Sequence, residues 1–176
     1  MADDSTTVEL TLSELRHVAG FAVVCARPAL ALFERDRPGD GRPRAAIDAA
    51  QAFAEGAERT KALRDRAWAA QRAAQDARDA GRAAASDAAR AALAAAGAAF
   101  LHPLAKATQV KHILGAAAHA ARAFEIDERA DGDEHIERSR RLADPVVVAV
   151  LRRYPAAPPG GGRVGELIRL LDASLR

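Results

Sequence analysis

ALRDRAWAAQRAAQDARDAGRAAASDAARAALAAAGAA, residues 62–99, is the stretch that decides the fold of this chain. Alanine is the strongest helix former, and the β-branched residues that favour strands are missing here. Gly81 divides the stretch into two predicted helices, residues 58–80 and 83–100. A low-complexity segment and a long alanine-rich rod are the competing readings, but a rod needs heptad leucines or isoleucines. The sequence therefore predicts two tightly packed helices.

The rest of the chain extends this pattern into one all-α domain. A chain of 176 residues is long enough to bury a core and has the length of one ordinary domain. We expect a single alanine-rich helical bundle of about six to seven helices. It should occupy residues 1–154, followed by a Pro/Gly linker at 155–163. An amphipathic C-terminal helix at 164–176 should pack on the same domain.

Local signals place several helix ends. Thr11 and Glu14 have the spacing of a capping box, so a helix should begin near Thr11. Pro28 should kink or split that helix, because proline lacks the backbone N–H. Pro43 suits the first turn of another helix. Pro145 falls at a kink or at the start of a separate apolar segment.

Charge and composition narrow the function classes. The 26 basic and 24 acidic residues nearly cancel, and acids alternate with the arginines of residues 59–78, so nucleic acid is not an expected partner. Cys25, the single cysteine, should be a buried thiol. Residues 1–10 lack the features of a signal peptide, and Arg27 and Pro28 interrupt the longest apolar run. We expect a cytoplasmic protein with no membrane partner.

No familiar enzyme signature is present. The chain contains no P-loop, GxGxxG, HExxH or GxSxG motif, and one cysteine rules out a cysteine-rich zinc site. The sequence therefore predicts no cofactor and no metal, and it leans away from an enzyme.

The candidate site residues fall into three groups. His112 and His119 are two helical turns apart on one face, about 10 Å along the axis, and His102 could fold back near them. The favoured interpretation of each is a partly buried, hydrogen-bonded packing histidine, with a ligand or general base as the alternative. Trp68 reads as a core or helix-packing anchor, with a partner-binding hot spot as the alternative.

The third group is the charged turn Asp40, Arg42, Arg44 and Asp48. Asp40 can cap the following helix, and Arg44 can pair with Asp48 at i and i+4, so a structural account is complete. The functional alternative is that Arg42 and Arg44 bind a carboxylate or phosphate, which the planar guanidinium fork suits.

Two segments carry a family resemblance. DGRPRAAIDAAQAFAEG, residues 40–56, resembles the DxRPRxAIxAARAWxxG signature of the bacterial Imm-5-like immunity proteins, which are small, all-helical and common in actinobacteria. HILGAAAHAARA, residues 112–123, resembles their second signature, HALGAAAYAAKA. Gln51 and Phe53 replace the Arg and Trp of the first signature, and His119 replaces an aromatic residue of the second.

Three functions remain open from the sequence. The resemblance implies a non-catalytic protein that neutralises a partner toxin by direct binding. The alternative is a small-molecule-binding helical protein or enzyme, of a biosynthetic or self-resistance type, with His102, His112 and His119 in one pocket and Arg42 or Arg44 at its mouth. A homodimer held by alanine faces is the third.

Overall fold

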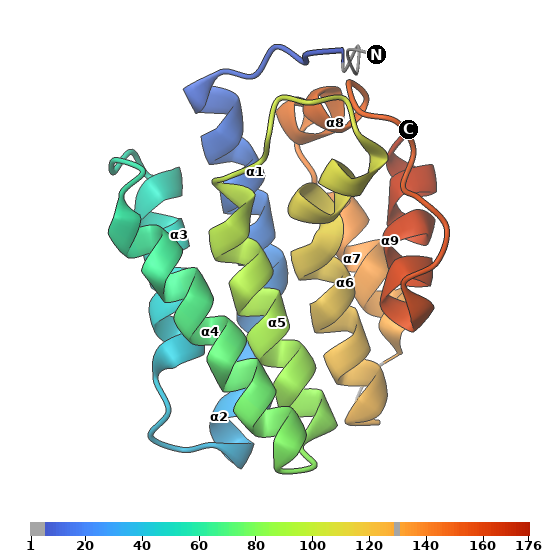
Figure 1. Cartoon of the computed structure of the whole chain (residues 1–176). Coiled ribbons are helices and arrows are strands. Elements are labelled where there is room, and N and C mark those ends of the chain that lie inside the picture. Colours follow the sequence, from blue (N-terminus) through green and yellow to red (C-terminus); the bar gives the residue numbers. More distant parts are fainter. Residues whose placement is uncertain (1–5, 129–130) are drawn as a thin grey trace, which may run out of the picture.

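A computed structural model describes residues 6–128 and 131–176, and in these residues it contains helices and no strand. The all-α prediction is confirmed. The α-helices are α1 (Leu12–Ala26), α2 (Leu30–Asp36), α3 (Arg42–Ala54), α4 (Lys61–Asp79), α5 (Ala83–Ala98), α6 (Val110–Ile126), α7 (Gly132–Leu142), α8 (Pro145–Leu151) and α9 (Gly162–Leu175). Figure 1 shows the long helices side by side as one bundle.

Two proline sites explain why these helices outnumber the six to seven that were expected. Around Pro28 the helix tightens into the 3-10 turn η1 (Arg27–Ala29), which separates α1 from α2. Pro145 opens the separate helix α8, and Asp144 caps it by accepting from the backbone N–H of Val147 at 2.8 Å. The capping box at Thr11 forms as the sequence predicts.

The alanine-rich helix α5 is the centre of the bundle. It packs against α1, α2, α3, α4 and α6, so nearly every side of it is covered. Ala91, Ala92, Ala95 and Ala96 are fully buried. Larger side chains would hold the neighbouring helices further from the axis, because protein interiors have no spare volume. The alanine content thus follows from the central position of this helix.

The first helical stretch is long and apolar enough to cross a membrane, by length and composition only. It runs from Leu12 to Asp36 when α1, the 3-10 turn η1 and α2 are counted as one helical stretch, so Arg27 and Pro28 interrupt the α-helix but not the apolar helical run. In its most apolar window, 61% of the residues are buried inside the bundle. Packing against the other helices therefore accounts for its apolar character.

The C-terminal helix α9 packs on α6 and α7. Leu167 and Leu171 are its fully buried contacts. The Pro/Gly segment before it is held by Arg169, whose Nη1 donates to the carbonyl oxygens of Pro158 and Gly160. This arrangement brings the start of α9 beside α6.

Two titratable groups are buried between α1, α6 and α7. Cys25 is a buried thiol, as predicted, and burial raises its pKa to about 12. His135 of α7 is also buried, with its ring centroid 5.2 Å from that of Phe124. Desolvation by burial lowers the pKa of His135 below its ordinary value of 6.5.

This burial makes the fold sensitive to mild acid. Below about pH 6.5 the unfolded chain protonates His135 while the folded chain resists, so the unfolded state binds more protons and stability falls. We expect a lower urea midpoint at pH 5.5 than at pH 7.5. The difference should shrink in His135→Leu and persist in His102→Gln, which alters an exposed imidazole. An equal pH dependence in both variants would show that His135 is not responsible.

Candidate functional site

The charged turn before α3 is held together by ion pairs. The Nε and Nη2 of Arg42 donate to the two carboxylate oxygens of Asp40 at 2.9 and 2.7 Å, and Nη2 also donates to Asp76 of α4 at 2.7 Å. The carboxylate of Asp40 also accepts from the backbone N–H of Arg42 at 3.2 Å. The Arg42 guanidinium holds the pKa of Asp40 below its usual value. These contacts fix the start of α3 onto α4.

Arg44 and Asp48 do not form the expected pair with each other. Arg44 instead donates from Nε and Nη2 to Glu34 of α2 at 2.6 and 2.8 Å. Asp48 lies 3.4 Å from the guanidinium of Arg27. A bidentate partner across the turn is stronger than a neighbour on one helix surface, which explains the difference. Both groups therefore link α3 to the α1–α2 stretch.

The three candidate histidines do not converge. His112 and His119 of α6 line one groove, whereas His102 lies in the loop after α5 with its side chain exposed. The backbone N–H of His102 donates to Gln109 at 3.0 Å, and its carbonyl accepts from the hydroxyl of Tyr154 at 2.9 Å. His102 thus serves the loop through its backbone.

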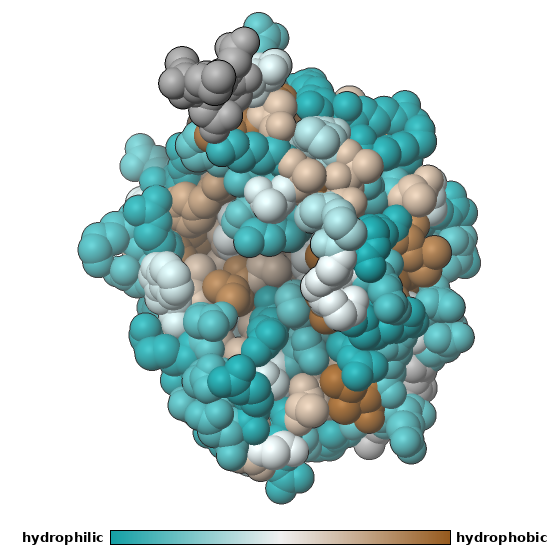
Figure 2. All heavy atoms as spheres, turned by 45° about the vertical axis from the view of Figure 1, so that its right-hand side comes forward, coloured by the Kyte–Doolittle hydropathy of each residue, from teal (hydrophilic) through white to brown (hydrophobic). Residues whose placement is uncertain are grey.

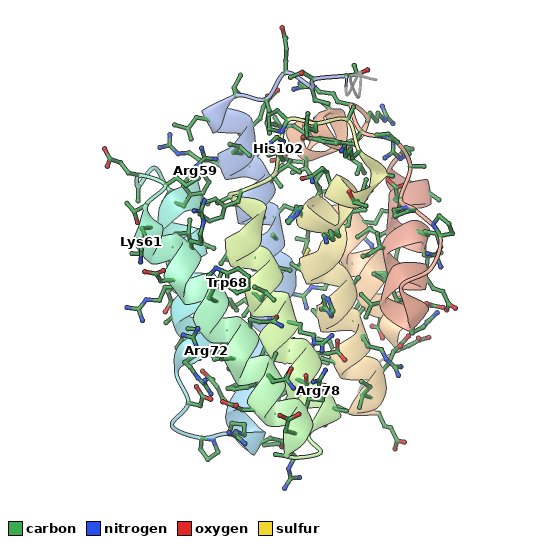
Figure 3. All side chains as sticks on the ribbon, in the orientation of Figure 1. Arg59, Lys61, Trp68, Arg72, Arg78 and His102 are labelled. Carbon is green, nitrogen blue, oxygen red and sulfur yellow. The ribbon has the colours of Figure 1, made fainter. Side chains whose placement is uncertain are left out.

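Trp68 is not a core residue, so the prediction that it is a core or helix-packing anchor is wrong. Trp68 on α4 is 58% exposed, the largest exposed fraction among the large apolar residues of the described chain. Figure 3 shows Trp68 on the surface of the α4–α5 pair. The inward face of α4 is formed by its neighbours Ala67 and Ala70, which leaves Trp68 pointing to solvent.

Trp68 borders a groove between α4, α5, α6 and α9, here called the Trp68 groove. Its volume is about 680 Å³. The apolar lining is Leu93, Ala94, Gly97, Gly115, Val164 and Ile168, and the polar lining includes Gln71, Arg90, Lys111, His112 and His119. Figure 2 shows an apolar hollow bordered by hydrophilic residues on this side of the molecule.

The two histidines of the Trp68 groove have different surroundings. Nδ1 of His119 lies 2.8 Å from Oδ1 of Asp87 on α5, and this hydrogen bond fixes the orientation of the ring. Nε2 of His119 is thereby left for another partner. Burial, with a smaller effect from Lys111, lowers the pKa of His112 below its ordinary value, which favours the uncharged ring.

A smaller pocket continues the Trp68 groove along the seam of α6 and α9. It shares Lys111, Gly161, Gly165 and Ile168 with the groove and extends to Thr108, Pro158 and Pro159. Its wall depends on Gly165, because a Cβ there would overlap the carbonyl oxygen of Gly160. No other residue type fits at this position without moving the backbone.

Gly165→Ala should therefore shift the loop before α9 and destabilise the protein by at least about 1 kcal/mol. Gly115→Ala is the matched control, since its Cβ would lie in ordinary contact with Ala94 at 3.7 Å. Thermal unfolding followed by circular dichroism measures both. Equal melting temperatures for the two variants would contradict the close backbone approach at Gly165.

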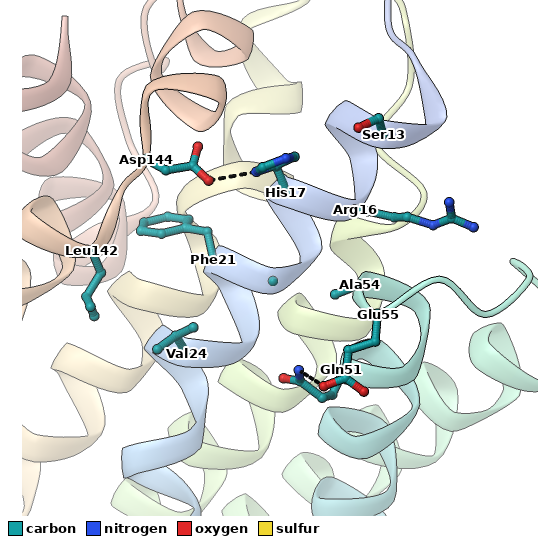
Figure 4. A pocket seen from close by; sticks show the side chains of 11 residues that line it. Ser13, Arg16, His17, Phe21, Val24, Gln51, Ala54, Glu55, Leu142 and Asp144 are labelled. Carbon is teal, nitrogen blue, oxygen red and sulfur yellow. Dashed lines mark hydrogen bonds and ion pairs between the residues drawn. The ribbon is translucent and has the colours of Figure 1, made fainter.

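A second pocket lies between α1, α3 and the α7–α8 junction, with a volume of about 410 Å³ (Figure 4). Within it, Nδ1 of His17 lies 2.7 Å from Oδ2 of Asp144. Asp144 also caps α8, so this pair joins α1 to α8. Gln51 donates to Glu55 at 2.6 Å on the opposite wall, as the figure shows. Two pairs of polar side chains are thus closed within the pocket, whereas Arg16 donates to the backbone carbonyl of Gly56 at 3.0 Å and its buried Nε has no partner in the described structure.

One acidic group in the described residues has the spacing of metal ligands. It consists of Glu125, Asp131 and Asp133. Glu125 accepts from Arg163 and from Arg122, which lower its pKa, so its charge is already compensated. The ion pairs with these arginines give the acidic group a structural role.

Sequence reasoning identified Trp68, His112 and His119 but missed most of the groove that they line. Arg90 is flanked by alanines and Lys111 precedes a histidine, and neither belongs to a recognisable motif. Val164 and Ile168 come from α9, and only the folded chain places them in the same groove as residues of α5. Their i, i+4 spacing around Gly165 is the one local signal that was available.

The comparisons with known proteins gave one match. Residues 9–145 match a family model described as "Imm-5 like putative immunity protein". No curated protein and no solved structure matches the chain. The matched range covers α1 to the start of α8 and includes both signature segments.

Proposed function

This chain belongs to the Imm-5-like family of immunity proteins, and from this premise we propose that it neutralises a partner toxin by direct, non-catalytic binding. The Trp68 groove and its rim are the proposed contact surface. The candidate residues of the first signature form ion pairs that stabilise the bundle. They are Asp40, Arg42, Arg44 and Asp48.

The exposure of Trp68 is the observation that carries this proposal. A tryptophan residue that is 58% exposed on a helix lacks the favourable free energy of burial in the free protein. Tryptophan is enriched among the residues that dominate binding energy at interfaces, especially when a pocket lies beside it. Here the Trp68 groove supplies such a pocket.

The test uses the polypeptide encoded by the gene adjacent to the one for this chain. Expressed alone in a host cell, that polypeptide should stop growth, and co-expression of this chain should restore it. Purified together, the two should form a complex of fixed stoichiometry in light scattering. A neighbour that is not toxic, or that stays toxic and unbound beside this chain, would contradict the proposal.

A second candidate function is small-molecule binding in the same groove. It is favoured by one observation, the orientation of His119 by Asp87 on a wall that also carries His112. An imidazole whose ring is held by one hydrogen bond presents its other nitrogen to a ligand. His102 is outside the groove, so the pocket has two histidines rather than the three expected.

A fragment set of aromatic carboxylates separates the two functions. Trp68 is the only tryptophan, so its fluorescence reports on the groove directly. Saturable quenching by a fragment, lost in His119→Gln and kept in His102→Gln, supports the small-molecule function. Absence of any saturable change across the set would count against it.

A further inference from the structure

We infer that the toxin segment entering the Trp68 groove is acidic and carries an apolar anchor side chain. This inference rests on the proposed function and specifies the chemistry of the partner. It is drawn from the charge, the shape and the floor of the groove.

The Arg and Lys residues that line the groove give it a positive charge. Its lining belongs entirely to the described residues and includes Arg90 and Lys111 but no Asp or Glu. Neither cation has an ion-pair partner in the described structure, whereas Arg42, Arg44 and Arg163 all do. The nearest acid on α5, Asp87, accepts from His119. A groove lined by unpaired cations attracts carboxylates and speeds their arrival.

The shape of the groove fits a chain segment. The Trp68 groove and the smaller pocket share four residues, so together they form a trough from α4 to the loop before α9. Trp68 lines only the groove, and Pro158 and Pro159 line only the smaller pocket. A compact ligand would fill one part of this trough, whereas a loop or helix of a protein can follow its length.

The floor of the trough is apolar. Leu93, Val164 and Ile168 are only partly buried against the core, so each leaves apolar surface open to solvent. Gly97 adds room, because a Cβ there would come no closer than 3.9 Å to Nδ1 of His112. An aliphatic or aromatic side chain from the partner would bury this surface beside Trp68.

The first experiment tests the charge. Association of the adjacent-gene polypeptide with this chain is measured by surface plasmon resonance at 20 and 300 mM NaCl. We expect Arg90→Glu/Lys111→Glu to slow association at low salt by about tenfold or more and to remove most of its salt dependence. The control Arg66→Glu/Arg82→Glu makes the same change in net charge at exposed residues outside the groove, and should have a much smaller effect.

The second experiment tests the anchor. Gly97→Leu places a side chain in the groove without changing its charge, and should weaken binding by about tenfold or more while keeping the salt dependence. Gly97→Ala, which makes only ordinary contacts, should bind within about twofold of the unmodified chain. Circular dichroism confirms that each variant is folded before binding is measured.

Failure of this inference is distinguishable from failure of the proposed function. If the unmodified chain binds and neutralises the polypeptide, but both charge reversals have equal effects or Gly97→Leu binds normally, the inference is wrong and the function stands. If neither the unmodified chain nor any variant binds, the function itself fails. Self-association that the groove reversal abolishes would overturn the inference in favour of a second copy of this chain.

Discussion

Replacing Trp68 with alanine should weaken binding of the toxin by about 30-fold or more, the effect of losing roughly 2 kcal/mol at a binding hot spot. Trp68 is 58% exposed in the free chain, so removal of its indole takes little from the core. The free energy of unfolding should therefore change by less than about 0.5 kcal/mol. Isothermal titration calorimetry gives the affinity, and urea unfolding gives the stability.

Leu170→Ala provides the matched control for this substitution. Leu170 is also a large apolar residue that is exposed to solvent, at 47%, but it does not line the groove. It should leave the affinity within about threefold of the unmodified chain. Equal losses from both substitutions would mean that general surface hydrophobicity, and not the Trp68 groove, governs the interaction.

Enlarging Ala95 to leucine should destabilise the protein by about 2 to 3 kcal/mol, because overpacking forces neighbouring side chains and backbone apart. Ala95 is fully buried on α5, and five helices surround that helix. None of them can retreat without opening contacts elsewhere in the bundle. The measurement is the midpoint of urea unfolding, with the slope of the transition checked for a change in the unfolded state.

Ala83→Leu makes the same chemical change at the exposed first residue of α5. It should alter stability by no more than about 0.5 kcal/mol. If Ala95→Leu is tolerated equally well, α5 is not the closely packed centre of the fold. The alanine content would then need another explanation, such as the base composition of the genome.

Local signals in the sequence predicted local structure well. The capping box of Thr11 and Glu14, the first-turn Pro43 and the break at Gly81 depend on neighbours within a few residues, and each forms as expected. The number of helices was underestimated at Pro28 and Pro145. Proline chemistry predicts an interruption there, but it does not say whether the chain continues as a new helix.

The misplacement of Trp68 has a specific cause. The hydrophobicity of indole suggested burial, whereas the helical spacing of the buried residues Leu63, Ala67, Ala70 and Ala74 marks another face of α4 as the inward one. Trp68 follows Ala67 directly and so points about 100° away from that face. The periodic pattern was the better guide, and its conflict with the residue type was itself a sign of a surface role.

Contacts between distant segments were beyond sequence reasoning. Arg44 forms its ion pair with Glu34 rather than with Asp48, and this pairing depends on the path of the turn between α2 and α3. The Trp68 groove needs α9 beside α6, and nothing in the alanine-rich helices specifies that neighbour. The relation between the charged turn and the histidine helix was likewise open. The charged turn before α3 contacts α4 through Arg42 and Asp76, whereas His112 and His119 of α6 lie in the Trp68 groove.

The most direct test of the account is a titration of this chain with the adjacent-gene polypeptide, followed by the fluorescence of Trp68 and by the activity of the toxin in the same samples. To isolate the signal, any tryptophan of the toxin is replaced by phenylalanine. The account predicts a saturable shift of Trp68 emission that reaches its end point at the same molar ratio at which toxicity is lost. Neutralisation with no change in Trp68 emission, or a mixture that stays fully toxic, would contradict it.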